Sequence, residues 1–192
     1  FDTQIIGSTN DYAKTTGSTP RIINDKGNDV ILHRLRSASI GEQIKLIRYF
    51  SKYNPDVLVM ECMAVNPQYQ WISEHKIVKS TLGVITNVRL DHLDEMGSTM
   101  NEIALSLSNT IPYNSTLITS ELDSKEILEG VSKNRKTEFC LANKKIDQEY
   151  LKKIPFIEHP ENISLALEVC EKVGVNKEDA LNGMLKTKPD PG

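Results

Sequence analysis

Short apolar runs alternate with longer stretches of helical periodicity along this chain, and this alternation is the feature that most constrains its fold. The apolar and β-branched runs have the length of buried strands, and one further run has the character of an edge strand. The buried runs cover 56–62, 82–88, 115–119 and 137–141, and the edge run covers 30–32. Strands that alternate with helices in this way predict an α/β fold with a mostly parallel sheet covered by helices on both faces.

Apolar residues at spacings of three and four predict the helices of the chain. One helix face is predicted to hold Ile40, Ile44, Ile47 and Phe50. Ser124 is the expected N-cap of a second helix. A third helix is predicted over 160–173, with Gly174 directly after its end. Asn176 is expected to cap a last, short helix.

The composition excludes several classes of protein. The chain of 192 residues is 39% apolar, and it has no run that approaches the roughly 18 apolar residues of a membrane span. A net charge of −3 with 26% charged residues leaves no basic surface for nucleic acid. The three cysteines lack C-x-x-C spacing, so we expect neither a disulfide framework nor a zinc site. A reducing, cytosolic setting fits best.

We expect one domain over residues 1–186, followed by a linker at 187–192. The linker contains two prolines and one glycine beside charged residues. The chain begins at Phe1, and this start has neither an initiator methionine nor an export signal. We therefore expect a central piece of a larger protein, joined through the linker to a C-terminal domain.

Polar side chains follow two of the predicted strands, at the sheet edge where α/β proteins bind ligands. Glu61 follows four apolar strand residues. If it is buried it needs a partner or a cation, and the alternative is a residue that already reaches solvent. Asn87, Asp91 and His92 follow the next strand, which we expect to be its neighbour. Such ligands suit Mg²⁺ or Mn²⁺ bound together with a phosphate, and the alternative for His92 is a structural hydrogen bond.

The residues that would bind phosphate are not evident. None of the glycines is spaced G-x-G, and no Gly-Lys-Ser/Thr occurs, so residue chemistry alone predicts only a metal-assisted α/β enzyme fragment. The polar segment 14–18 is either a substrate or phosphate contact or a surface turn. Arg21, Arg34 and Arg36 either bind an anionic substrate or form a solvated face. Cys62 has no evident basic partner and is expected to be a buried, inert thiol.

At these strand ends the sequence resembles the ligase subunits of poly-γ-glutamate synthases, capsule-biosynthesis proteins of the CapB type. These are relatives of the muramyl (Mur) ligases and of folylpolyglutamate synthase. The matching blocks are Glu-Cys-Met-Ala-Val-Asn-Pro from Glu61, Asn-x-x-x-Asp-His-x-Asp-x-x-Gly from Asn87, and Ile-Pro-Tyr-Asn from Ile111. Shorter matches lie at 14–18, 40–43, 162–167 and 189–192. The resemblance implies a Mur-ligase-like central domain of the P-loop type, with the P-loop segment itself upstream of Phe1.

The resemblance also implies a reaction, the ATP-dependent formation of γ-glutamyl amides through an acyl phosphate with Mg²⁺ or Mn²⁺. By this resemblance Glu61 would hold the ATP-linked metal, and His92 would hold or position a second one. Asn87 and Asp91 would fix the His92 ring, and Asn162 would read the adenine edge. The other implied cofactor-binding residues are Lys14, Thr15, Thr16 and Gly17.

Two departures from the family pattern qualify this expectation. The chain lacks a P-loop, so we expect it to be inactive alone. Mur ligases commonly carry a carbamylated lysine about fifteen residues after the histidine, but no lysine occurs between Lys79 and Lys125. A carbamate that bridges two metals is therefore not expected.

The resemblance further implies glutamate and a poly-γ-glutamate chain as substrates, and small membrane subunits as partners. The protein would then lie in the cytoplasm at the inner face of the membrane, held there by its partners or by a segment upstream of the chain. A homo-oligomer is compatible with this reading. The alternatives are a folylpolyglutamate or muramyl ligase, which the block from Glu61 disfavours, and a non-catalytic remnant that acts as a binding or assembly module.

Overall fold

A computed structural model describes the strands 5–9, 21–23 and 29–31, and residues 40–62, 64–154, 156 and 158–187. The segment 14–18, Arg34, Arg36 and the linker after 187 lie outside the described residues. The chain divides into two compact units, Phe1–Lys79 with Asp190–Gly192, and Ser80–Pro189. The single domain over 1–186 stays a prediction, and each unit is described by itself.

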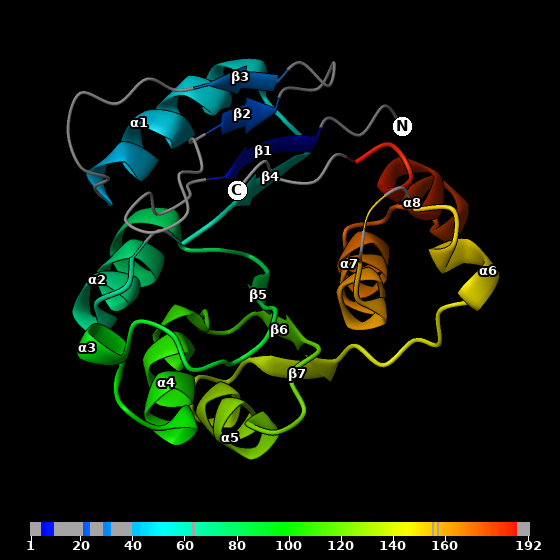
Figure 1. Ribbon diagram of the computed structural model, residues 1–192. Coiled ribbons are helices and arrows are strands. Elements are labelled where there is room, and N and C mark those ends of the chain that lie inside the picture. The colour runs from blue at the N-terminus through cyan, green and yellow to red at the C-terminus, as the bar shows by residue number, and fades with distance from the viewer. Residues whose placement is uncertain are drawn as a thin grey trace. The chain divides into compact units, whose positions relative to one another are not determined.

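The first unit contains a four-stranded sheet in the order β3-β2-β1-β4 (Figure 1). Its strands are β1 Ile5–Thr9, β2 Arg21–Ile23, β3 Asp29–Ile31 and β4 Val57–Met60. β1 runs parallel to β4 and antiparallel to β2, and β2 runs antiparallel to β3. The predicted strand at 56–62 and the predicted edge strand at 30–32 are confirmed, whereas β1 and β2 were not expected.

Helix α1 (Gly41–Phe50) packs on β4 through Leu46 and Phe50, which contact Leu58 and Met60. The predicted buried face of this helix is wrong in part, because Ile44 is 41% exposed and Gln43 is buried in its place. A buried amide is tolerated when it is hydrogen-bonded. Gln43 meets that condition, because both its Nε2 and its Oε1 are hydrogen-bonded. The unit continues through η1 (Ser51–Tyr53), α2 (Pro67–Ile72) and the π-helical η2 (Ser73–Val78).

The second unit contains a three-stranded sheet in the order β5-β6-β7, and both strand pairs are parallel. The strands are β5 Gly83–Ile85, β6 Thr116–Thr119 and β7 Glu138–Leu141, at three of the predicted positions. The helices of this unit are α3 Leu93–Met96, α4 Met100–Leu107, η3 Ser108–Thr110, α5 Lys125–Asn134, α6 Gln148–Leu151, α7 Pro160–Lys172 and α8 Lys177–Met184.

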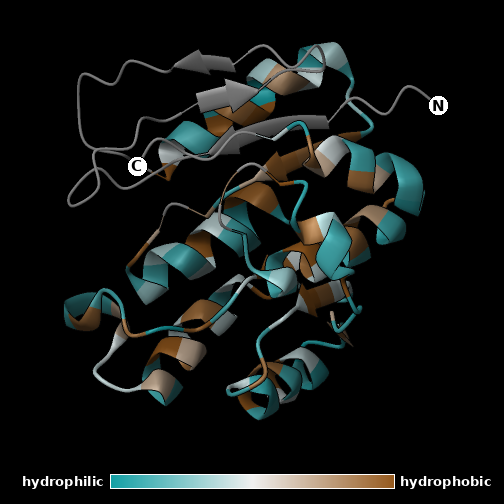
Figure 2. Ribbon diagram, turned by 45° about the vertical axis from the view of Figure 1, so that its right-hand side comes forward, coloured by the Kyte–Doolittle hydropathy of each residue, from teal (hydrophilic) through white to brown (hydrophobic). Residues whose placement is uncertain are grey.

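Helices cover both faces of this sheet, as the sequence predicted. On one face Leu117 of β6 packs with Leu128 of α5, and on the other face Ile118 packs with Leu165 of α7. Residues of β6 therefore alternate between two apolar clusters, and the whole strand is buried. The helices carry both apolar and polar residues along their length (Figure 2), as expected for helices with one face on a core.

The ends of the last two helices follow the sequence signals closely. Pro160 is the first residue of α7, and Gly174 after it has a φ of +86°, which a glycine adopts without strain. The Asn176 side chain accepts a hydrogen bond from Asp179 N and caps α8. These boundaries were predictable because they depend on residues close in sequence.

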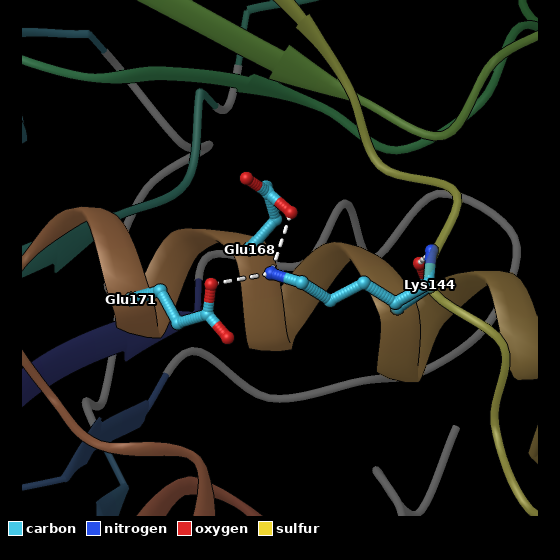
Figure 3. Close-up of polar contacts among 4 residues, drawn as sticks. Lys144, Glu168 and Glu171 are labelled. Carbon is cyan, nitrogen blue, oxygen red and sulfur yellow. Dashed lines mark hydrogen bonds and ion pairs between the residues drawn. The ribbon is translucent and has the colours of Figure 1, made fainter.

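A lysine after β7 ties the loop to α7. The Lys144 ammonium lies 2.6 Å from a carboxylate oxygen of Glu168 and 2.7 Å from one of Glu171 (Figure 3). Its backbone N–H donates to the Ser164 hydroxyl at 2.7 Å. Desolvation lowers the pKa of Lys144, but the bonds to the two carboxylates outweigh it, so that the pKa is raised. This cluster pairs the Lys144 charge with two carboxylates and ties the loop after β7 to α7.

Within the described residues, no helix has both the length and the apolar character that a membrane span requires.

Candidate functional site

Glu61 directly follows β4 and is exposed, so the structure favours the reading in which it reaches solvent. Its backbone carbonyl accepts a hydrogen bond from Gln43 Nε2 at 3.3 Å. Gln43 is held in turn by the Ser73 hydroxyl, which donates to Gln43 Oε1 at 2.5 Å. These two bonds hold the backbone at the strand end, while Glu61 itself is exposed.

The residues after Glu61 form the junction between β4 and α2. The Asn66 side chain accepts from Gln68 N at 3.0 Å, and Pro67 is the first helical residue. Cys62 is exposed as a residue, so the expectation of burial holds only for its sulfur. Burial of its sulfur beside Ser73 still raises the pKa of the Cys62 thiol. The thiolate is therefore disfavoured, and a nucleophilic role is not supported.

Asn87, Asp91 and His92 lie on the segment between β5 and α3. Asn87 and Asp91 are exposed and His92 is half-buried. Asp91 Oδ1 accepts from His92 N at 2.8 Å, and Asp91 Oδ2 lies 3.7 Å from His92 Nε2. The structure thus brings Asp91 and His92 together.

His92 has an unusual backbone conformation at the start of α3. Its φ is +49° and its ψ is +46°, in the left-handed region that few non-glycine residues adopt. The His92 carbonyl accepts from Glu95 N and Met96 N, both at 2.9 Å, so the short helix begins on this residue. Such conformations recur at functional sites, where the surrounding structure compensates for the strain.

A buried glutamate that the sequence analysis missed supports this segment. Glu121 follows β6 and is 7% exposed. Its Oε2 accepts from Val88 N at 2.7 Å, and its Oε1 accepts from Asp123 N at 2.8 Å and Ser124 N at 3.0 Å. The predicted N-cap, Ser124, makes no side-chain cap to α5. A related signal, a carboxylate two residues after a buried strand, marks Glu121 and would have found it.

Asn162 lies in the exposed first turn of α7. Its Nδ2 donates to Glu158 Oε1 at 2.7 Å, and the same oxygen accepts from His159 N at 2.9 Å. Glu158 therefore sets the orientation of the Asn162 amide. The other predicted cofactor contacts, Lys14, Thr15, Thr16 and Gly17, lie outside the described residues.

The strand before Glu61 and the strand before Asn87 each pair with a different strand, and their expected adjacency stays a prediction. β4 is paired with β1, whereas β5 is paired with β6 in a second sheet. In the part of the chain that the structure describes, no three His, Cys, Asp or Glu side chains gather as a metal site. Mg²⁺ needs fewer protein ligands than that when it binds with ATP, since waters and phosphate oxygens complete its coordination. Glu61 in the first unit and Asp91 and His92 in the second each offer a ligand type that such a metal takes.

Solved structures share this fold. The apo form of FPGS from L. casei matches with a TM-score of 0.64 and 13% identity, covering 97% of this chain and 56% of that chain. E. coli FolC in complex with DHPP and ADP matches with a TM-score of 0.64 and 14% identity, covering 98% and 51%. A bifunctional folylpolyglutamate synthase/dihydrofolate synthase with Mn, AMPPNP and L-glutamate bound matches with a TM-score of 0.60 and 15% identity, covering 98% and 52%. The chain therefore has the α/β fold of these solved synthases.

Two curated proteins have a higher sequence identity to this chain than these solved structures have. The capsule biosynthesis protein CapB of Bacillus anthracis is 39% identical over 183 residues, which are 93% of this chain and 39% of that protein. The PGA synthase CapB of Bacillus subtilis is 40% identical over 182 residues, 93% of this chain and 46% of that protein. No family model matches the chain. The chain is thus a relative of CapB proteins over most of its own length, and it spans less than half of theirs.

Proposed function

We propose that this chain is part of an ATP-dependent ligase that joins glutamate residues through γ-amide bonds. The observation that carries this proposal is the 39–40% identity to CapB proteins across 93% of the chain. In the first step a glutamate carboxylate attacks the γ-phosphorus of ATP, which gives an acyl phosphate and ADP. In the second step the amine of another glutamate displaces phosphate, loses a proton and forms the amide.

The main physical obstacle is the approach of a carboxylate to a triphosphate. Two unit charges at ~4 Å repel by about 1 kcal/mol in water and about 4 kcal/mol at an effective dielectric constant near 20. A divalent cation, Mg²⁺ or Mn²⁺, supplies the charge that offsets this repulsion and stabilises the phosphoryl group during transfer.

Two exposed strand ends supply the residues for this chemistry. Glu61, whose backbone carbonyl is held by the Gln43 and Ser73 network, would offer a carboxylate oxygen to the metal bound with ATP. His92 would offer a ring nitrogen to a metal beside the acyl phosphate, with Asp91 orienting it through its backbone N–H and its ring. Asn87 lies on the same segment and would contribute an amide. The lysine that would carry a bridging carbamate in Mur ligases has no counterpart, because Ser106 on α4 is a buried serine.

The nucleotide and the partners are assigned by the same relationship. Asn162, oriented by Glu158, would read the adenine edge, and the segment 14–17 would contact the phosphates. Glutamate and the growing chain would be the substrates. We propose that the whole protein works with small membrane subunits at the inner face of the membrane, that it tolerates self-association, and that this chain alone is inactive because the P-loop is supplied upstream.

Calorimetry with Mg²⁺-ATP tests the proposal, on this chain and on a form extended upstream in its reading frame. We expect heat of binding from the extended form alone. Glu61→Ala and His92→Ala in the extended form should weaken binding or remove glutamate-dependent ADP release while the unfolding transition stays cooperative. Glu129→Ala is the matched control, because Glu129 is an exposed glutamate on α5. Full activity in both site variants would refute the metal assignment, and absence of binding by either form would favour the non-catalytic alternative.

A further inference from the structure

The hydrogen-bonded ladder between β5 and β6 ends at the pair Ile85 and Thr119. Beyond that pair, two side chains from the end of β6 continue the connection. The Ser120 hydroxyl donates to the Thr86 carbonyl at 2.8 Å, and Glu121 Oε2 accepts from Val88 N at 2.7 Å. The segment after β5 is therefore held to β6 by side chains where the backbone bonds stop.

The two bonded groups belong to the two peptide units that flank Asn87. The Thr86 carbonyl is in the peptide before Asn87, and the Val88 N–H is in the peptide after it. Fixing both peptide planes fixes the φ and ψ of Asn87, since these two torsions are all that connect the planes. The direction of the Asn87 side chain from its Cα is then set by Ser120 and Glu121.

The anchoring is strong for three reasons. Glu121 is 7% exposed, and its bond to Val88 N is charge-assisted and buried. Its second oxygen is committed to Asp123 N and Ser124 N, so the carboxylate cannot turn away without breaking bonds at the start of α5. The Val88 side chain, 3% exposed, packs with Ile103 and Ala104 of α4.

We propose that Ser120 and Glu121 are positioning residues that act through Asn87. They hold its amide at the sheet edge that would face the metal-bound phosphates. This inference rests on the proposed ligase function. It adds two residues that directly follow β6, a strand whose end carries none of the predicted site residues.

The same pair of strands provides a matched control. Ser115, just before β6, donates its hydroxyl to the Thr81 carbonyl at 2.6 Å, just before β5. Ser115 and Ser120 thus make the same kind of bond between the same two strands, at opposite ends. Only the Ser120 bond lies next to Asn87, so the two alanine variants separate positioning from general support of the sheet.

The experiment measures glutamate-dependent ADP release by the complete protein expressed from this reading frame. Outer partners of metal-site residues typically contribute about 10- to 100-fold in activity, so we expect Ser120→Ala and Glu121→Gln to lower kcat by about that factor. Ser120→Thr, which keeps the hydroxyl, should restore kcat, and Ser115→Ala should change it less than about twofold, as expected for a change remote from the site. Ser120→Ala should add no further loss to Asn87→Ala, because it acts through that residue.

Amide hydrogen exchange over 86–92 gives a readout that does not depend on activity. We expect faster exchange there in Ser120→Ala and Glu121→Gln than in Ser115→Ala. Equal exchange in the Ser120→Ala and Ser115→Ala variants, equal loss of kcat in both, or additive losses with Asn87→Ala would overturn the inference. A wild-type protein that releases no ADP with glutamate, but shows the expected exchange pattern, would contradict the ligase function and still support the positioning of Asn87.

Discussion

Replacement of Glu121 by alanine should destabilise the second unit far more than a surface substitution. The change removes the acceptor for three backbone N–H groups, of Val88, Asp123 and Ser124. The bonds to Val88 and Ser124 are buried, whereas that to Asp123 is only part-buried and can be replaced by water. Each buried donor left unsatisfied costs about 1–3 kcal/mol, so we expect a total loss of roughly 2–6 kcal/mol.

Urea unfolding of the wild-type chain and of Glu121→Ala, followed by circular dichroism, measures this loss. With a urea dependence of about 2 kcal/mol per M, a loss near 3 kcal/mol lowers the midpoint by about 1.5 M. The same loss lowers the thermal midpoint by roughly 6–12 °C in a chain of this size. Glu129→Ala, on the exposed face of α5, should leave the midpoint unchanged. If Glu121→Ala and the Glu129→Ala control unfold at the same urea midpoint, the view of Glu121 as a buried, stabilising acceptor is refuted.

Three further results are expected. Gly83→Ala places a Cβ 2.6 Å from Cδ of buried Pro112 and should lower the free energy of unfolding by about 1–3 kcal/mol. Gly130→Ala, which adds a Cβ in open space on α5, should raise the free energy of unfolding by about 0.5–1 kcal/mol. Urea unfolding curves of both variants check this. The hydrogen bond from Lys172 lowers the pKa of Glu138, so its stabilisation should be present above the unfolded pKa and be lost as the pH falls through the lower folded one. The stability difference between wild type and Glu138→Gln should therefore shrink in acid, and a constant difference would contradict this. The raised pKa of Cys62 should make it react with iodoacetamide more slowly at neutral pH than free cysteine, as labelling followed by mass spectrometry can show.

Local patterns in the sequence were sufficient for the secondary structure at several places. The run 115–119 became the buried strand β6, and the helix predicted over 160–173 became α7, with Pro160 and Gly174 at its ends. Coverage of both sheet faces also followed from the alternation of strands and helices. These features depend on residues within a few positions of one another, so one sequence contains the information.

The candidate site was predictable in part. The strands that precede Glu61, Asn87, Asp91 and His92 were predicted, although β4 and β5 end two and three residues before the predicted runs do. The contact between Asp91 and His92 also follows from their adjacency in sequence. The pairing of β4 with β1 did not follow, because a strand's partner is chosen among distant segments.

The sequence by itself determined where several strands and helices form and which loops carry polar side chains, whereas the tertiary structure decided which polar side chains are buried. On α1 it placed Gln43 inside and Ile44 outside, because Ser73 and the carbonyl of Glu61 satisfy the amide. After the strands it buried Glu121 and exposed Glu61. A buried carboxylate requires donors, and those of Glu121 include Val88 N, 33 residues earlier in the chain. Such a partner is supplied only when the strands have been brought side by side.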